Sequence, residues 1–341
     1  VLVMSSVPVN PVFRLHPNDA QASAKAIEHQ RRQLRLARRV GIKVGTPVVT
    51  HVDGNLALGR IGSLIEQIAR LRQEGRDAVI VTSGAISTGS LRMRKTMTLN
   101  STLHDAIRQK KLGSDDINKS AASAVGQSLL MNMYETLFSK YNLSCAQVLI
   151  TEDDVASAET LSQVCETTME LMQLGTVPII NDNDAITQRM MPVFDDDTSE
   201  IKWDNDVLAS RIATVLRADL LIMLTDLPSL YAEPPAGSSS SAPVRLAVFH
   251  PEAKLVRSGI ESTPLMLLTD GGRGEFAGRT RMAAECMQAL VDASVNACAA
   301  GVNAAVVTTG HHPLSIDRIL RGEDVGTLFL AGGNGGGVSK L

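Results

Sequence analysis

The chain has 341 residues, which is enough for one large domain or two small ones with an ample core. Its net charge of −3 gives no general signal for polyanion binding, and at 3% aromatic residues it has too few rings for stacking on nucleic acid. No apolar run approaches the roughly 18 residues of a membrane span, and the four cysteines have no metal or redox spacing, so we expect a soluble intracellular protein that binds neither nucleic acid nor membrane.

The first 38 residues have little periodic pattern and are rich in arginine, with Asp19 and Glu28 as their acidic residues. A solvated leading helix is one interpretation. A targeting remnant is the other, since mitochondrial transit segments are arginine-rich and poor in acidic residues. We predict an extension over 1–38, one domain over 39–331 and a glycine-rich, disordered tail over 332–341. We expect a cytoplasmic location, or a mitochondrial one if the extension is a targeting segment.

From residue 39 onward, apolar strand patterns alternate with amphipathic helix patterns. The predicted strands are 40–50 (interrupted near Lys43), 77–82, 145–151, 177–180, 218–225, 304–308 and 325–330. The predicted helices are 56–74, 117–140, 159–174, 205–217, 279–300 and 313–321, with a further helix starting after Ser83. A flexible surface insertion is predicted at 234–243. Such alternation favours an α/β fold with a parallel sheet covered on both faces.

Two clusters of short polar side chains lie in the middle of the chain. Asn181-Asp182-Asn183-Asp184 comes directly after the apolar run 177–180, and Asp204-Asn205-Asp206 precedes a helix pattern. Open α/β sheets bind ligands at the carboxyl ends of their strands, and amide and carboxylate groups suit a small zwitterion. Turns and helix caps use the same residue types. Because two clusters occur without His or Cys, we favour an organic ligand over a transition metal.

Two more junctions carry candidate ligand groups. Lys43 lies in an apolar strand pattern and is followed by Gly45 and Thr46; such a lysine either snorkels to solvent or meets an anion, and a glycine lets a phosphate approach the backbone. Ser83-Gly84-Ala85 joins a strand to a helix, and the first amides of a helix favour anions, although Ser83 could simply be a helix cap. The usual nucleotide-binding motifs, Walker A and G-x-G-x-x-G after a strand, are absent.

An ordered set of segments resembles the glutamate 5-kinases of the amino acid kinase family, and most closely the kinase domain at the amino end of eukaryotic pyrroline-5-carboxylate synthases. The matching segments are KVGTPVVT (43–50), LALGRIGSLIEQ (56–67), VTSGAISTG (81–89), AVGQSLLMNMYETLF (124–138), NDNDAI (181–186), WDNDVLA (203–209), ADLLIMLTD (218–226) and RGEDVGTLF (321–329). Each segment alone is weakly specific, but together they follow the family's order over residues 38–331.

The resemblance implies a three-layer αβα sandwich around a mainly parallel sheet of about eight strands. It also implies transfer of the ATP γ-phosphoryl group, with Mg²⁺, to the side-chain carboxylate of L-glutamate, the first step of proline biosynthesis. The implied catalytic residues are Lys43, Asp206 and Arg281. Those for the substrate are Ser83, Gly84, Asn181, Asp184 and Asn205, and those for the nucleotide are Lys43, Gly45, Thr46, Thr225 and Asp226. No residues are implied to hold a metal by themselves, proline is a candidate feedback inhibitor, and self-association is expected.

The family's late glycine-rich loop, which ends in a lysine on the phosphates, is the place where this sequence departs from the pattern. Counting without a gap from residue 301 puts that lysine at Leu290 and one of the glycines at Glu285. A shifted register could instead supply Arg279 or Arg281, with a different reach from lysine. Two alternatives to an active glutamate 5-kinase therefore remain. One is a non-catalytic relative that binds glutamate or proline, and the other is a kinase for acetylglutamate, aspartate or carbamate.

Overall fold

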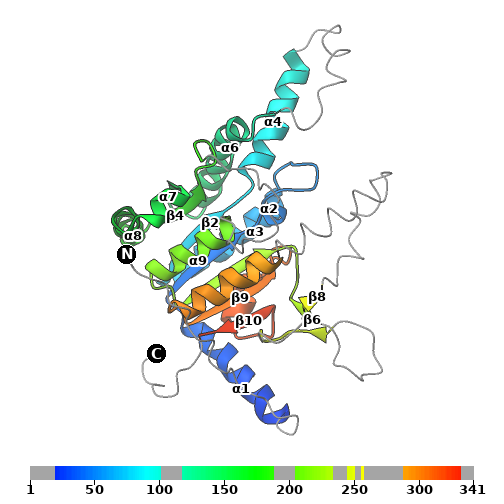
Figure 1. Ribbon diagram of the computed structural model, residues 1–341, viewed down its shortest axis with the longest axis vertical. Helices are drawn as coiled ribbons and strands as arrows, with labels where there is room; N and C mark the ends of the chain where they lie inside the picture. Colours follow the sequence, from blue (N-terminus) through cyan, green and yellow to red (C-terminus); the bar gives the residue numbers. More distant parts are fainter. Residues whose placement is uncertain are drawn as a thin grey trace, which may run out of the picture.

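A seven-stranded sheet forms the centre of the molecule. The computed structural model describes residues 20–100, 117–187, 204–232, 244–249, 255–256 and 287–331 (Figure 1). Within these residues the strand order is β10-β9-β5-β1-β2-β4-β3. β10 runs antiparallel to β9, and all other neighbours pair in parallel. The strands are β1 (Arg39–Val44), β2 (Asp77–Thr82), β3 (Cys145–Ile150), β4 (Val177–Asp182), β5 (Leu220–Thr225), β9 (Ala304–Thr309) and β10 (Thr327–Leu330).

The predicted count of about eight strands differs by one from the seven strands of the described sheet, and the edge beside β10 explains the difference. There the chain forms a single parallel bridge, between Val248 and Leu328, with hydrogen bonds from Phe249 N to Leu328 O and from Leu328 N to Ala247 O. A second, small sheet has the order β7-β6-β8. Its strands are β6 (Tyr231–Ala232), β7 (Val244–Arg245) and β8 (Leu255–Val256).

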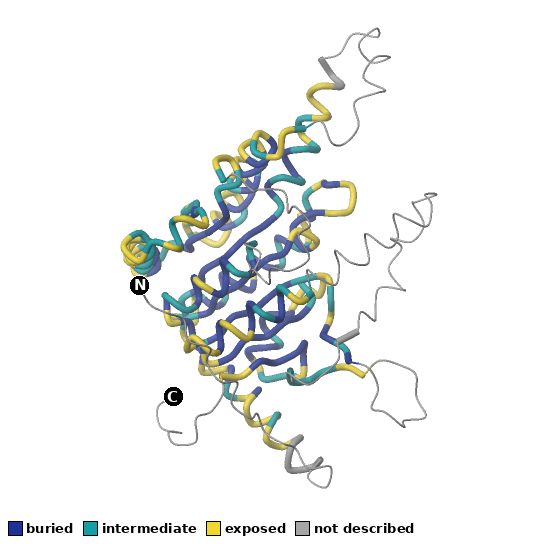
Figure 2. Tube along the Cα trace, viewed as in Figure 1, coloured by how far each residue is buried: buried dark blue, intermediate teal, exposed yellow. Residues whose placement is uncertain are grey.

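Helices cover both faces of the large sheet, as expected for a three-layer αβα sandwich (Figures 1 and 2). One face packs against α2 (Thr46–Val49), α3 (Leu58–Gln73), α6 (Lys119–Ser139) and α11 (Ser315–Leu320). The other face packs against α8 (Ala158–Gln173), α9 (Asn205–Val215) and a helix that covers 287–299. The remaining helical segments are α1 (Ala20–Gln33), η2 (Leu34–Leu36), α4 (Ala85–Asn100) and α7 (Glu152–Ala156).

The strands are apolar on both faces because both faces are covered. Along β1, Val40, Ile42 and Val44 belong to the core on the α3 side. Gly41 and Lys43 alternate with them and therefore face α9. An added Cβ at Gly41 would lie 3.6 Å from the Ala213 side chain of α9, which fits this direction. The same alternation turns Lys43 away from the larger core cluster.

The predicted strand over 40–50 is corrected by the structure, because β1 ends at Val44 and α2 begins at Thr46. Pro47 lies in the first turn of α2, where its fixed φ favours a helix and its missing N–H has no intrahelical acceptor to lose. The apolar residues Val48 and Val49, which extended the strand pattern in the sequence, are buried in the core from this helix. The other predicted helices and strands agree with the described elements to within a few residues at their ends, except that residues 279–286 of the predicted helix 279–300 lie outside the described residues.

The arginine-rich segment before residue 39 contributes to the packed unit. Arg31 of α1 is 2% exposed and donates to the carbonyl oxygens of Val325 (2.7 Å), Ala247 (2.7 Å), Gly326 (3.1 Å) and Glu323 (3.3 Å). Leu34 is part of the core on the α3 side. The sequence placed the start of the domain at 39, whereas buried contacts extend upstream to at least Arg31. The predicted tail over 332–341 and the insertion over 234–243 lie outside the described residues.

Two glycines let α4 and α6 approach each other closely. A Cβ on Gly89 would lie 1.8 Å from the backbone oxygen of Ala122, and a Cβ on Gly126 would lie 1.8 Å from the backbone oxygen of Ala85. Real side chains do not tolerate such distances, so the two backbones touch only because both residues are glycine. The crossing fixes the start of α4 against the middle of α6.

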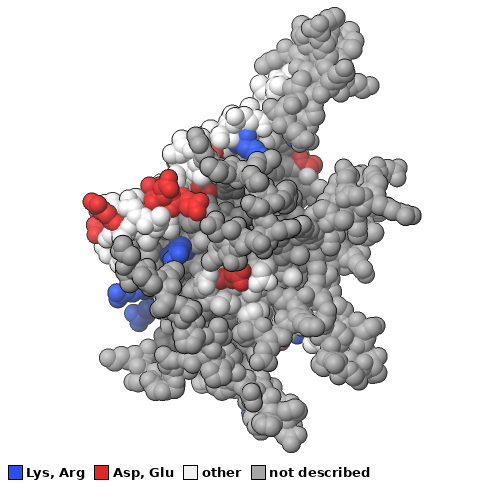
Figure 3. All heavy atoms as spheres, viewed as in Figure 1, with Lys and Arg blue, Asp and Glu red and all other residues white. Residues whose placement is uncertain are grey.

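The face seen in Figure 3 carries acidic side chains over the end of the molecule that holds α7 and α8. The first turn of α7 contains Glu152, Asp153 and Asp154, where negative charge interacts favourably with the helix dipole. Among the described residues, no helix combines the length and the apolar character that crossing a membrane requires.

Candidate active site

The predicted site residues that the structure describes, which exclude Arg281, lie near the ends of the strands of the large sheet. Val44, the last residue of β1, pairs with Thr82 of β2 and with Leu224 of β5, so the segments that follow these strands emerge side by side. The chain runs from β1 to β2 on one side, and β5 returns to the other side of β1. Such a reversal of strand order is where open α/β sheets bind ligands. The crevice beyond β1, β2 and β5 is therefore the expected ligand site.

The first turn of α9 connects two of these strand ends. The Lys43 Nζ lies 2.6 Å from Asp206 Oδ1, with side chains only 10% and 12% exposed. The neighbouring Asn205 donates from Nδ2 to Ser83 Oγ at 2.9 Å. One helical turn thus fixes both the ammonium group from β1 and the hydroxyl group that follows β2. The structure brings these four predicted residues together.

Asp204 is the N-cap of α9. Its Oδ1 accepts from the backbone N–H groups of Asp206 (2.8 Å) and Val207 (3.0 Å), which satisfies two N–H groups that have no partner inside the helix. Burial, followed by the nearby Asp206 carboxylate, raises the pKa of the Asp204 carboxyl group. Asp204 therefore serves the helix start, while Asp206 faces Lys43. The capping interpretation of this cluster is right for Asp204.

Gly45 and Gly84 let the turns after β1 and β2 approach their neighbours. A Cβ on Gly45 would lie 3.1 Å from Leu224 O, and the Gly45 N–H donates to that oxygen at 3.0 Å. Gly84 has φ +98°, which favours glycine, and its Cβ would lie 3.3 Å from Val49 Cγ1 of α2. The turn that contains Thr46 and the turn after β2 are consequently in contact through α2.

The cluster after β4 is less open than the sequence suggested. Asn181 is 1% exposed; its Nδ2 donates to Gln127 Oε1 of α6 at 2.9 Å, and its Oδ1 accepts from Asp182 N. The side chain is thus tied to α6 and to its own strand. Asp184 lies in the turn that follows β4. Both residues lie at the same edge of the sheet as Ser83, and their role toward a substrate stays a prediction.

Thr225 and Asp226 follow β5, next to β1. Thr225 Oγ1 donates to Asp226 Oδ1 at 2.9 Å, and the Gly310 N–H donates to Thr225 O at 2.8 Å. Asp226 is exposed. The pair therefore lies at the end of β5, on the side of β1 opposite β2 and Ser83, and its role beside a nucleotide stays a prediction.

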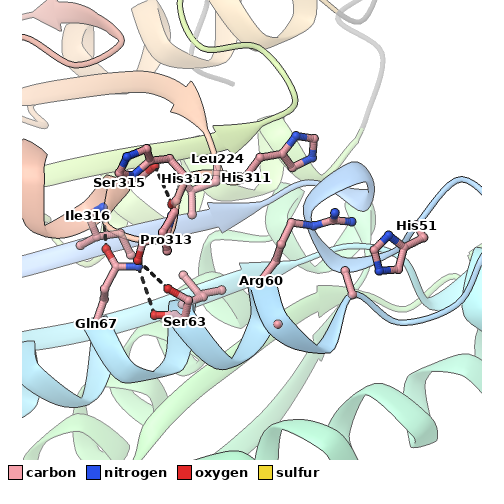
Figure 4. A pocket seen from close by; sticks show the side chains of 14 residues that line it. His51, Arg60, Ser63, Gln67, Leu224, His311, His312, Pro313, Ser315 and Ile316 are labelled. Atoms are coloured by element: carbon pink, nitrogen blue, oxygen red, sulfur yellow. Dashed lines mark hydrogen bonds between the residues drawn. The ribbon is translucent and has the colours of Figure 1, made fainter. Parts of the chain in front are cut away.

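Two cavities border this arrangement. One of about 360 Å³ lies between α3 and the loop after β9 (Figure 4). The other, of about 520 Å³, lies between α6, the end of β3 and the residues after β4, with Gln127, Asp182 and Asn183 among its lining residues. Neither is lined by Lys43 or Ser83, so the site is defined by the side-chain contacts at the strand ends.

Comparison with known proteins identifies the family. The model of the amino acid kinase family matches residues 38–309. The chain belongs to the amino acid kinase family. Delta-1-pyrroline-5-carboxylate synthase of Mesembryanthemum crystallinum is 38% identical over 292 residues, which cover 86% of this chain and 37% of the relative. Glutamate 5-kinase of Symbiobacterium thermophilum is 35% identical over 299 residues, which cover 88% of this chain and 98% of the relative.

The chain spans about two-fifths of the length of the synthase relatives, such as the 40% covered in Delta-1-pyrroline-5-carboxylate synthase 2 of Oryza sativa subsp. japonica. Among solved structures, carbamate kinase from Giardia lamblia bound to AMP-PNP superposes with a TM-score of 0.52 at 11% identity, over 87% of this chain and 99% of that one. At this identity the likeness concerns the fold alone. The predicted amino acid kinase fold is confirmed.

The late loop of this amino acid kinase is only partly described. Arg281 and Glu285 lie outside the described residues. Leu290 lies in the helix that covers 287–299 and is 4% exposed, within the core cluster on the α9 side. A cationic side chain at position 290 could not reach a bound phosphate without leaving the core. Position 290 is therefore a packing position, and the ungapped comparison does not identify the family's lysine.

Several contacts at the site were missed by the sequence analysis. Gln127 holds Asn181, and the buried Tyr134 shares a 2.9 Å hydrogen bond with Thr82 Oγ1 at the end of β2. Burial raises the pKa of Tyr134 to about 12, so the phenol stays neutral. Both residues come from α6 and are far from the strand ends in sequence. Their segment belongs to the family pattern, but nothing in its periodicity indicates polar contacts with β2 and β4.

Proposed function

We propose that this amino acid kinase is a glutamate 5-kinase, which transfers the ATP γ-phosphoryl group to the side-chain carboxylate of L-glutamate and yields L-glutamyl 5-phosphate. This reaction is the first step of proline biosynthesis. The observation that carries the proposal is the Lys43–Asp206 ion pair of 2.6 Å, placed beside the Asn205–Ser83 contact at the carboxyl edge of the sheet. Relatives named glutamate 5-kinase, similar over most of the chain, support the choice of reaction.

The chemistry requires positioning rather than proton transfer. The acceptor carboxylate is already ionised at neutral pH, so no general base is needed. Two anions must instead be held together while negative charge on the transferring group is neutralised. The Lys43 ammonium would supply that charge, and Asp206 would hold it in place. Mg²⁺ bound to the nucleotide phosphates would reduce the remaining repulsion.

The neighbouring residues divide between the two substrates in this proposal. The backbone of Gly45 and Thr46 would face the phosphates, with Thr225 and Asp226 beside the nucleotide. Glutamate would lie against Ser83, Gly84 and Asn205, on the side of Asn181 and Asp184. Arg281 is proposed as a further phosphoryl cation. On the resemblance we also propose proline as a feedback inhibitor and self-association of the chain. The proposed location is cytoplasmic, or mitochondrial if the arginine-rich start is a targeting segment.

A non-catalytic glutamate- or proline-binding protein is the second candidate, because the ungapped comparison leaves no lysine in the late loop. The burial of Leu290 in the core supports the first candidate over this one, because a side chain at position 290 packs into the core on the α9 side. A kinase for another small carboxylate or for carbamate is a third candidate. Comparing these acceptors at fixed ATP separates it from the first.

The test is formation of γ-glutamyl hydroxamate from ATP, Mg²⁺, L-glutamate and hydroxylamine. We expect product with the wild-type chain and a loss of turnover of about three orders of magnitude in Lys43→Ala, because a phosphoryl cation contributes about 4 kcal/mol at the barrier. Lys140→Ala, which removes an exposed lysine at the end of α6, is the matched control. Glutamate binding without product would favour the non-catalytic candidate, and unchanged turnover in Lys43→Ala would remove Lys43 from the mechanism.

A further inference from the structure

The short helix α2 begins directly after Gly45 and carries Thr46, so its position sets the backbone that faces the crevice. Four residues are too few for a helix to satisfy its own carbonyl groups. Nearby backbone N–H groups satisfy some of these carbonyl groups. Gly45 O accepts from Val48 N (2.9 Å) and Val49 N (3.2 Å), and Thr46 O accepts from Thr50 N (2.9 Å). Val49 O accepts from Ala57 N at 2.8 Å.

The remaining carbonyl groups of this segment are held by one arginine. Arg60, in the first turn of α3, donates from Nε to Val48 O (3.0 Å) and from Nη2 to Thr50 O (2.8 Å) and Pro47 O (3.2 Å). His311, in the loop after β9, donates from Nε2 to Pro47 O at 3.2 Å. With these bonds every carbonyl group from Gly45 to Thr50 has a donor.

Figure 4 shows how the two side chains reach α2 from different elements. Arg60 rises from α3 on one wall of the 360 Å³ cavity, and His311 comes from the opposite wall. The planar guanidinium group presents several N–H groups in a fixed fork, which a lysine ammonium on a flexible stem cannot reproduce. The three carbonyl groups are thus held in one geometry by a single rigid group.

A shift of α2 would disturb both the end of β5 and the turn after β2. At its start, the Gly45 N–H is fixed to Leu224 O, and on its side Val49 lies against the Gly84 turn. Misplacement of reacting groups by about 1 Å costs roughly a factor of 100 in rate. We propose that Arg60, assisted by His311, is a positioning residue that holds α2 so that the Gly45–Thr46 backbone meets the nucleotide phosphates. This inference rests on the proposed function, because the phosphates in question are those of the ATP that the proposed kinase binds.

The experiment measures nucleotide affinity, KM for ATP, kcat and the free energy of unfolding for Arg60→Lys and Arg60→Ala. We expect Arg60→Lys to weaken ATP binding about tenfold and to lower kcat about tenfold, with KM for glutamate changed less than KM for ATP. His311→Ala should have a smaller effect, about twofold, because Pro47 O keeps Arg60 as a donor. Arg72→Lys, on the same helix and bonded to Arg76 O and Met172 O away from the crevice, is the matched control.

Chemical rescue separates positioning from general stability. Guanidinium ion at millimolar concentration should restore part of the ATP affinity of Arg60→Ala, because the cavity beside Arg60 gives it access to the three carbonyl groups, whereas sodium chloride at equal ionic strength should not. Wild-type ATP affinity and kcat in Arg60→Lys would overturn the inference. So would losses in Arg60→Ala that match its unfolded fraction and resist rescue. Nucleotide binding is measured apart from turnover. A wild-type chain that binds ATP without making product would therefore contradict the proposed function, while its ATP affinity could still be compared with that of the Arg60 variants.

Discussion

Lys43 and Leu290 show that a residue type reveals little about function until the direction of its side chain is known. Both lie on elements whose neighbours are apolar, yet Lys43 ends in an ion pair with Asp206, and Leu290 ends in the core. The lysine was found from sequence because a charged side chain in a strand pattern needs an anion or solvent. The leucine was compared with a phosphate-binding lysine because the counting ignored which face of the helix it occupies.

We expect Leu290→Lys to destabilise the protein without raising its turnover. An unpaired ammonium group buried among apolar side chains costs about 3 kcal/mol or more in the free energy of unfolding, measured by urea denaturation. Leu290→Met, which nearly conserves volume, should cost less than about 1.5 kcal/mol. A Leu290→Lys variant that is as stable as the wild type and turns over faster would show that position 290 does reach the phosphates.

The predicted residues that the structure brings together lie at strand ends or at a helix start. Lys43 is near the end of β1 and Ser83 follows β2, and the carboxyl ends of parallel strands meet at one edge of a sheet. Asn205 and Asp206, predicted from a polar cluster ahead of a helix pattern, form the first turn of α9. Gln127 and Arg60 lie on helices, where the rotation of the helix and its packing decide which side chains reach the crevice. No spacing rule gives that rotation to the accuracy of a hydrogen bond.

At the scale of elements, the segment after β1 is where the pattern and the structure differ. Val48 and Val49 continue the apolar run of β1, and period alone cannot separate a short buried strand from a helical turn. The structure resolves the ambiguity through Pro47 at the start of α2 and through the carbonyl contacts of Arg60. These contacts come from the next helix, which explains why a local reading of the sequence missed the turn.

The crossing of α4 and α6 gives a prediction at this scale. In Gly126→Ala the new Cβ would meet the Ala85 carbonyl group, so we expect a loss of about 1–3 kcal/mol in the free energy of unfolding. KM for glutamate should also rise, because Ala85 directly follows the Ser83-Gly84 turn.

Gly62→Ala in α3 is the matched control for that substitution. Nothing lies within 4 Å of its added Cβ, and alanine has the higher helix propensity, so it should stabilise the protein by up to about 1 kcal/mol. Equal stability of the two alanine variants in thermal unfolding would contradict the close helix crossing.

At the scale of the whole molecule, the arginine-rich segment joins the two ends of the described chain. Arg31 donates to four backbone carbonyl groups contributed by the segment beside β10 and by residues 323–326. From its sequence this segment has two interpretations, a solvated helix or a targeting remnant, because arginine is common to both. Charge alone could not predict that Arg31 is buried against residues 323–326, which belong to the last segment of the family pattern.

We expect Arg31→Met to lower the free energy of unfolding by about 3 kcal/mol or more, because several buried carbonyl groups lose their donor and each costs roughly 1–3 kcal/mol. Urea denaturation measures the loss. Arg32→Met is the control, since the Arg32 side chain is 66% exposed and pairs only with the exposed Glu28 among its described contacts; its effect should stay within about 0.5 kcal/mol. Equal effects of the two substitutions would mean that Arg31 is not a structural clamp.

The position of β1 in the middle of the sheet also determines when the molecule can fold. The Arg39 N–H donates to the side chain of Asp219, 180 residues later in the chain, and the Arg31 side chain donates to Val325 O, 294 residues later. At about 5–20 residues per second of translation, β1 is synthesised roughly 10–40 s before its partner β5. During that time the edge of β1 that pairs with β5 has no native partner, and an unpaired strand edge is a template for pairing with another chain.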